Sequence, residues 1–230
     1  MKIEPMRLLA WMSLALALPA HPARAIELAA VAGARMVVPV KSWKETRFTA
    51  TVRQQFDFSC GSAALATLLS HHYGYHVTEE TVFEQMYLKG DQQKIRQQGF
   101  SLLDMQAFLA SRGFRADGFE LPLEKLVQAQ LPAIVLVSDK GYHHFVVIKG
   151  IADGRILVGD PSSGTRTIGL ARFRELWRSK LLFVIHDYNG AVAFNRDADW
   201  RAAPLAPLAQ GMARNTFDAV SLPKFGPGDF

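Results

Sequence analysis

The stretch that decides the fold is QQFDFSCGSAALATLLSHHYG, residues 54–74. After Cys60 its apolar side chains recur every three or four positions, which is the spacing of a helix with one apolar face. Gly74 follows directly and is typical of the end of a helix. The sequence therefore predicts a helix over residues 60–73, with the single cysteine of the chain in its first turn.

The segments that follow predict helices first and strands afterwards. Residues 78–88 and 101–113 have helical spacing, and Ser101 with Asp104 forms the pattern of a capping box. Short apolar runs bounded by Gly, Asp and Lys predict strands at 133–138, 143–149, 155–159 and 181–185, with one more helix at 170–177. This order is typical of an α+β fold with a mostly antiparallel sheet.

The composition fits one good-sized domain with extensions. The 230 residues are 49% hydrophobic and 20% charged, which supports a packed core and excludes wholesale disorder. A single cysteine excludes an intrachain disulfide and a Cys-rich zinc module. The net charge of +5 is not gathered into a Lys/Arg cluster, so we expect no nucleic-acid partner.

The N-terminus has the order of a secretory signal peptide. Lys2 and Arg7 flank the start of the chain, residues 8–18 are apolar, and Ala23-Arg24-Ala25 matches a cleavage site. The apolar run is shorter than the roughly 20 residues that span a bilayer. We therefore expect residues 1–25 to be removed, which lowers the net charge from +5 to +3 and leaves no stable membrane anchor. An uncleaved anchor is the alternative.

The remaining chain divides into three parts. Residues 26–50 form an N-terminal extended arm, and the β-branched runs at 35–40 and 47–52 are expected to be strands or extended segments. Residues 51–188 hold the predicted helices and strands. Residues 189–230 are an Ala/Pro-rich extension, interpreted as an arm over the surface or a partly disordered segment without recognisable chemistry.

Cys60 is the candidate nucleophile. At the start of a helix, free backbone N–H groups and the positive end of the helix dipole stabilise a thiolate. Gly61 next to it permits close approach of another chain to the sulfur. The alternative is a buried structural cysteine that acts as a small hydrophobic residue.

His144 and Asp160 are the candidate base and its orienting group. His143 and His144 open the strand run FVVIK, and Asp160 comes 16 residues after His144. A strand out, a turn near Asp153 and a strand back bring Asp160 beside His144 as a hairpin neighbour. Taken singly, a core histidine and an Asp-Pro turn are the ordinary interpretations.

Gln54 is the candidate oxyanion donor. It lies six residues before Cys60, so its side-chain amide can join the Cys60 backbone N–H in stabilising a tetrahedral oxyanion, an effect often worth ~3 kcal/mol. The adjacent Gln55 stays open as an alternative on these grounds.

Together these motifs resemble the C39 peptidase family of papain-like cysteine peptidases. The resemblance covers residues 51–188 and rests on Gln54-x5-Cys60-Gly61, Gly99-Phe100-Ser101-Leu102, Leu131-Pro132-Ala133-Ile134, His144-Phe-Val-Val and Asp160-Pro161. It implies the papain-like α+β fold, Cys60 as nucleophile, and Gln54 in the oxyanion hole. It also implies His144 as general base and acid, oriented by Asp160, because the family places its histidine directly before the Phe-Val-Val run. Ser59 departs from the Asp that many members carry there.

The signal peptide makes the chain most similar to the stand-alone periplasmic members of the family, which are encoded with functional-amyloid (Fap) secretion machinery. This resemblance implies a periplasmic cysteine endopeptidase acting on a polypeptide, such as an amyloid subunit or a secretion component. We expect no metal, because His71, His72 and His76 lack a carboxylate or cysteine partner. We expect no cofactor and no ATP, and the Gly-rich loop at 159–164 lacks the Lys-Ser/Thr ending of a P-loop. The alternatives are a non-catalytic peptide-binding or assembly module that uses the same cleft, and an acyl transferase.

Overall fold

The computed structural model describes residues 26–28, 36–38, 42–139 and 141–203. The predicted signal peptide and residues 204–230 of the extension lie outside the described residues. The chain divides into two units, Met1–Ser42 and Trp43–Phe230. In the first, β1 (Ile26–Leu28) pairs antiparallel with β2 (Met36–Val38). Strand β2 lies in the run 35–40 that was predicted to be a strand or an extended segment, whereas β1 was not predicted. Among the described residues no helix is long and apolar enough to cross a membrane.

Residues 47–52 do not form the expected strand. Helix α1 (Trp43–Arg47) ends there, and the Phe48 N–H donates to the Glu45 carbonyl (3.1 Å) in the turn that follows. The backbone N–H of Val52 donates to the Thr67 hydroxyl (2.9 Å). A local turn and one side-chain acceptor thus take the place of a neighbouring strand, so β-branched composition alone was misleading.

Four helices follow, and three of them match the predicted segments. They are α2 (Cys60–His72), α3 (Glu79–Lys89), α4 (Gln92–Gln98) and α5 (Leu102–Ser111). The capping box of Ser101 and Asp104 is present at the start of α5. Helix α4 was not predicted, since Ile95 is its one buried side chain. Helix α2 is buried along almost its whole length, so it is the central helix of the fold.

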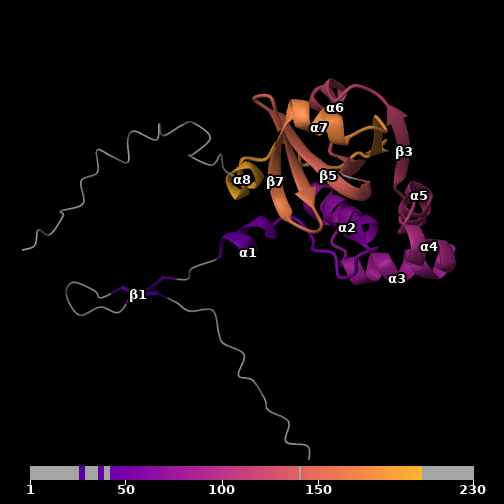
Figure 1. Cartoon of the computed structure of the whole chain (residues 1–230), viewed down its shortest axis with the longest axis horizontal. Coiled ribbons are helices and arrows are strands. Elements are labelled where there is room, and N and C mark those ends of the chain that lie inside the picture. The colour runs from indigo at the N-terminus through magenta and orange to yellow at the C-terminus, as the bar shows by residue number, and fades with distance from the viewer. Residues whose placement is uncertain (1–25, 29–35, 39–41, 140, 204–230) are drawn as a thin grey trace, which may run out of the picture. The chain divides into compact units, whose positions relative to one another are not determined.

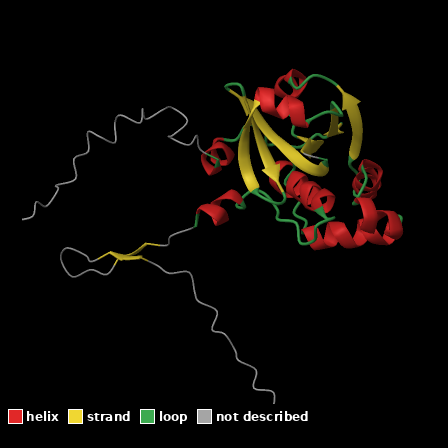
Figure 2. Cartoon of the chain, in the orientation of Figure 1, coloured by secondary structure: helices red, strands yellow, loops and turns green. Residues whose placement is uncertain are grey.

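The second half forms a six-stranded antiparallel sheet (Figures 1 and 2). The strand order is β3-β8-β4-β5-β6-β7. The strands are β3 (Arg115–Glu120), β4 (Ala133–Asp139), β5 (Tyr142–Ala152), β6 (Arg155–Asp160), β7 (Gly164–Gly169) and β8 (Leu181–His186). Three helices accompany them: α6 (Glu124–Ala129), α7 (Leu170–Leu176) and α8 (Asp197–Ala202). The predicted α+β architecture is confirmed.

The sheet carries a hydrophobic core on each face. One core joins α2, α3 and α5 to the sheet and includes Leu65, Met105 and Val147. The other lies between the sheet and α6 and α7, and includes Ile148 and Phe173. Since neighbouring residues of β5 enter different cores, β5 is fixed in register by burial on both of its faces.

The described part of the C-terminal extension packs onto the domain. We call residues 189–203 the C-terminal strap. Its backbone is tied down where the Ala193 N–H donates to the His72 carbonyl (2.8 Å), and Phe194 is buried in the second core. Its helix α8 buries Asp199. Of the two interpretations offered by the sequence, the arm over the surface describes these residues.

Candidate active site

Cys60 is the first residue of α2, as the sequence predicts. Its side chain is mostly buried, with 9% of the residue exposed. Ser59 precedes the helix but does not cap it, because the Ser59 hydroxyl bonds to Phe56 instead. The backbone donors of the first turn therefore keep their positive potential for a group placed beside the sulfur.

His144 and Asp160 lie side by side on the β5–β6 hairpin. The His144 Nε2 atom is 2.8 Å from Asp160 Oδ1, and the two residues are 6% and 3% exposed. Burial alone would lower the pKa of His144, but the hydrogen bond to Asp160 and the neighbouring Cys60 outweigh it and raise the pKa to about 9. At neutral pH the ring is thus an imidazolium that interacts with both groups.

His144 thus lies between Cys60 and Asp160 and interacts with both side chains. The Nε2 atom of the ring is bound to Asp160, whereas Nδ1 is buried and makes no hydrogen bond to another described residue. The Nδ1 atom is therefore the one available to exchange a proton with the thiol and then with a substrate. His143 is exposed and lines a separate hollow with Ser138, so the structure favours His144.

Asp160 is held by donors on both of its oxygens. Oδ1 accepts from the Ser162 N–H (2.9 Å), the Ser162 hydroxyl (2.7 Å) and the Ser163 N–H (3.3 Å), besides His144. Oδ2 accepts from Arg166 Nε (3.1 Å) and from a terminal nitrogen of the same side chain (3.0 Å). Burial would raise the pKa of Asp160, but the bonds from His144 and Ser162 hold it far below the usual range. The carboxylate stays charged and its orientation is set.

Gln54 lies next to this group through its backbone and side chain. Its N–H donates to the Pro161 carbonyl (3.1 Å), directly after Asp160. Its Nε2 donates to the Phe56 carbonyl (3.0 Å), which leaves the second amide hydrogen for a further acceptor. Gln54 is half-buried and Gln55 is exposed, so burial distinguishes the two alternatives that the sequence left open.

Comparison with known proteins identifies the family of the chain. The sequence profile described as the Peptidase C39 family matches residues 49–189. The chain belongs to this family. Two relatives are named "Probable functional amyloid protease FapD". The one from Pseudomonas aeruginosa is 41% identical over 64% of this chain and 65% of its own length, and the one from Pseudomonas fluorescens is 38% identical over 82% and 80%.

A solved structure shows the same fold. The peptidase domain of Streptococcus ComA, a bi-functional ABC transporter, is matched with a TM-score of 0.50 and 23% identity, over 59% of this chain and 96% of that domain. Family membership confirms the predicted C39 resemblance and the class of cysteine peptidase. The solved structure confirms the predicted papain-like α+β architecture. The share of the P. aeruginosa protein that is matched falls just below two thirds of its length.

Sequence reasoning missed two side chains at the candidate active site. The Tyr142 ring stacks on the His144 ring, with centroids 5.8 Å apart and planes at 25°, while 56% of Tyr142 is exposed. Partial burial and charge interactions with Cys60 and Asp57 raise the pKa of Tyr142. Its place two residues before His144 on one strand was the available signal, because such residues share a face. The other is Arg166, whose contact with Asp160 crosses from β7.

His72, the last residue of α2, has a structural role. His72 is 2% exposed, and its Nδ1 atom lies 2.6 Å from the Ala193 carbonyl of the strap. Burial is the main reason that its pKa is lowered to about 4, so the ring is neutral at ordinary pH. Among the described residues no group of three or more His, Cys, Asp or Glu side chains is arranged to hold a metal ion.

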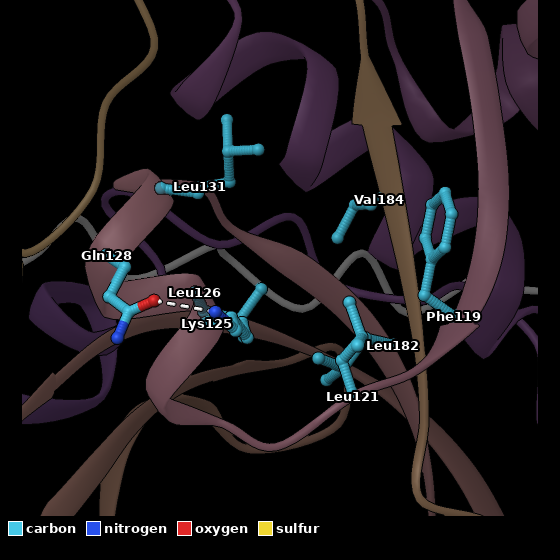
Figure 3. Close-up of a pocket in the computed structure, with 9 residues that line it drawn as sticks. Phe119, Leu121, Lys125, Leu126, Gln128, Leu131, Leu182 and Val184 are labelled. Carbon is cyan, nitrogen blue, oxygen red and sulfur yellow. Dashed lines mark hydrogen bonds between the residues drawn. The ribbon is translucent and has the colours of Figure 1, made fainter.

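A separate apolar hollow of about 430 Å³ lies between α6 and strands β3 and β8 (Figure 3). Phe119, Leu182 and Val184 line it, and Lys125 donates to Gln128 at its rim (3.0 Å). Strand β8 is separated from the His144 strand by β4. The hollow is therefore not part of the candidate active site.

Proposed function

We propose that this chain is a periplasmic cysteine endopeptidase that hydrolyses a peptide bond in a secreted or amyloid-system protein. The observation that carries the proposal is the buried relay of Cys60, His144 and Asp160, in which the ring is cationic beside the single thiol. Such a pair is an activated nucleophile with its acid–base partner and an orienting group. Neither a structural cysteine nor a passive binding cleft requires this arrangement.

The chemistry follows from the protonation state of His144. The imidazolium favours the thiolate form of Cys60, and the thiolate attacks the substrate carbonyl carbon. The oxyanion accepts from the Cys60 backbone N–H and from the second amide hydrogen of Gln54. His144 Nδ1 then gives its proton to the leaving amine, which departs and leaves a thioester on Cys60.

Hydrolysis returns the enzyme to its first state. Neutral His144 takes a proton from a water molecule while that water attacks the thioester carbonyl. The second tetrahedral intermediate expels the thiolate, releases the new carboxyl group and leaves His144 protonated. Asp160 holds the ring through Nε2 in both half-reactions, so that Nδ1 stays directed to the reacting atoms.

The substrate and the compartment are supported by sequence. The signal-peptide pattern of residues 1–25 supports export, and an oxidising periplasm tolerates a lone cysteine that is mostly buried. The name shared by the two Pseudomonas relatives supports a substrate belonging to a functional-amyloid system. An extended segment of such a protein would enter at the exposed ring of Tyr142.

The test is a comparison of Cys60→Ala with the wild type. We expect the variant to keep the far-UV circular dichroism and thermal midpoint of the folded protein and to lose peptide cleavage. Mass spectrometry of envelope proteins from cells carrying wild type or Cys60→Ser then identifies the substrate and the scissile bond together. Full cleavage by purified Cys60→Ala, or identical envelope peptides in the two strains, would contradict the proposal and favour a binding module.

A further inference from the structure

The face of the sheet on which Asp160 lies depends on an irregularity in β5. Strands β5 and β6 are joined by the two-residue turn Asp153-Gly154, with φ of 50° and 69°, as in a type I′ hairpin. Beside the turn, Ala152 pairs with Arg155 and Gly150 with Leu157. If this register continued, Asp160 would lie opposite the residue at position 147.

In that regular hairpin, the side chains of Asp160 and His144 would lie on opposite faces of the sheet. Directly opposed residues of an antiparallel pair share a face, and successive residues alternate between faces. Asp160 opposite Val147 would project on the face of Val147, whereas His144 projects on the face of Val146. The His144–Asp160 hydrogen bond could not form in this register.

The structure avoids this by one extra residue in β5. Beyond Gly150 the pairs are Ile148 with Val158 and Val147 with Gly159, so the register shifts by one between Ile148 and Gly150. This is a β-bulge, and the additional residue is Lys149. Continuing the shifted register places Asp160 opposite Val146, on the face of His144, in agreement with the 2.8 Å contact between them.

The β4–β5 ladder ends where Ala133 pairs with Ile148, so the bulged end of β5 has no partner strand on that side, and the C-terminal strap supplies partners there. The Ile151 N–H donates to Asn195 Oδ1 (2.7 Å), the Asn195 N–H donates to the Lys149 carbonyl (2.9 Å), and Asn195 Nδ2 donates to the Ile151 carbonyl (3.3 Å). A Cβ atom at Gly150 would collide with Asn195 Oδ1. Asn195 has a φ of 54°, a left-handed conformation that asparagine tolerates well.

The side chain of the extra residue is a second anchor. Lys149 is 0% exposed, and its Nζ atom donates to the Ala50 carbonyl (2.7 Å) and lies 3.2 Å from Asp199 Oδ1 in α8. Both Asn195 and Asp199 lie beyond residue 189, where the match to the C39 profile ends. The bulge is therefore held by a part of this chain outside the matched region.

We infer that Asn195 is a positioning residue for the active site: by holding the bulge it fixes the hairpin register that puts Asp160 beside His144. This inference rests on the proposed function, since it assigns the strap a role in the same relay. Asn195 acts through the backbone of Lys149 and Ile151, two residues whose own side chains take no part in the chemistry.

The experiment uses the full chain and the rate of Cys60 alkylation by iodoacetamide between pH 5 and pH 9, which requires no substrate. Asn195→Gly removes the side chain while allowing the positive φ. With Asp160 no longer held beside His144, the thiolate is less favoured, and we expect alkylation at pH 6 to slow roughly tenfold, toward an ordinary thiol that ionises near pH ~8.5. Asn195→Asp keeps an acceptor for Ile151, and we expect an intermediate rate.

Two comparisons separate positioning from general destabilisation. Trp177→Phe removes the bond from the Trp177 ring to the Leu181 carbonyl (3.1 Å), away from the hairpin, and should leave the alkylation profile unchanged. In an Asp160→Asn background, Asn195→Gly should slow alkylation no further, because the contact it protects is already lost.

The outcomes distinguish this inference from the proposed function. A wild-type thiol that reacts at pH 6 no faster than an ordinary thiol argues against the relay itself. A reactive wild type together with an unchanged profile in Asn195→Gly overturns the positioning role alone. An equal loss in the wild-type and Asp160→Asn backgrounds also overturns it, since the effect would then bypass Asp160.

Discussion

Replacing Asp199 with alanine would leave the ammonium of Lys149 buried without a counter-charge. In the wild type the two charges are 3.2 Å apart, and their side chains are 0% and 2% exposed. Removing one partner of such a pair usually costs about 3–5 kcal/mol, because the other charge stays desolvated. At about 2–4 °C per kcal/mol for a domain of this size, the thermal midpoint of Asp199→Ala should fall by roughly 10 °C.

The same variant should recover at high pH, and the sign follows from Lys149. Burial holds the pKa of Lys149 below its ordinary value, while Asp199 opposes this shift. Without Asp199 the pKa of Lys149 in the folded variant is lower than in the folded wild type, and further below the pKa of the same lysine in the unfolded chain. The unfolded state then binds more protons, so the unfolding free energy of the variant rises with pH until the unfolded lysine also titrates near pH ~10.4.

Urea unfolding followed by tryptophan fluorescence measures this at pH 7 and pH 9.5. We expect the difference in unfolding free energy between wild type and Asp199→Ala to narrow at the higher pH. Asp197→Ala is the matched control, since Asp197 is an exposed aspartate in the same helix, and it should cost less than about 1 kcal/mol. A cost below 1 kcal/mol for Asp199→Ala, or a gap that widens with pH, would refute the reasoning.

Three further predictions concern the relay. In the proposed mechanism protonated His144 gives its proton to the leaving amine. Because the pKa of His144 is about 9, kcat/KM should fall above pH 9 in the wild type and from a lower pH in Asp160→Asn, as a pH–rate profile would show. Arg166→Gln removes the two donors to Asp160 Oδ2 and should lower kcat on the order of tenfold with KM unchanged. A change in KM as large as the change in kcat would contradict a purely orienting role. Tyr142→Ala removes the ring that stacks on His144, so it should raise KM and expose the His144 ring to solvent. Tyr142→Phe keeps the stacking and should behave as wild type in the same steady-state assay.

Much of the fold could be predicted because the decisive segments carry strong local patterns. Helix α2 follows from apolar spacing and Gly74, and α5 from its capping box. The central strands β4 and β5 are apolar runs since both of their faces are buried. These segments also place Cys60 and His144 at element starts, where a single sequence can locate them.

The missed elements lacked such patterns for physical reasons. Strand β3 (RADGFE) has one buried residue and lies at the edge of the sheet, so charges and a glycine are tolerated. Strand β7 (GTRTIG) is the other edge and is rich in polar residues. The strap could not be predicted because its partners, the carbonyls of His72 and Lys149, lie far away in sequence and are invisible in composition.

The pairing of His144 with Asp160 shows how a correct prediction can rest on an incomplete argument. A hairpin with the turn at Asp153-Gly154 does bring the two strands together, but in a regular hairpin the two side chains project from opposite faces. One additional residue in β5 reverses that relation, and a bulge of this kind has no signature in a single sequence beyond Gly150. In the proposed relay the His144–Asp160 geometry depends on contacts made about fifty residues after His144 by Asn195, so the proposed functional unit extends past the strands that carry the reacting groups.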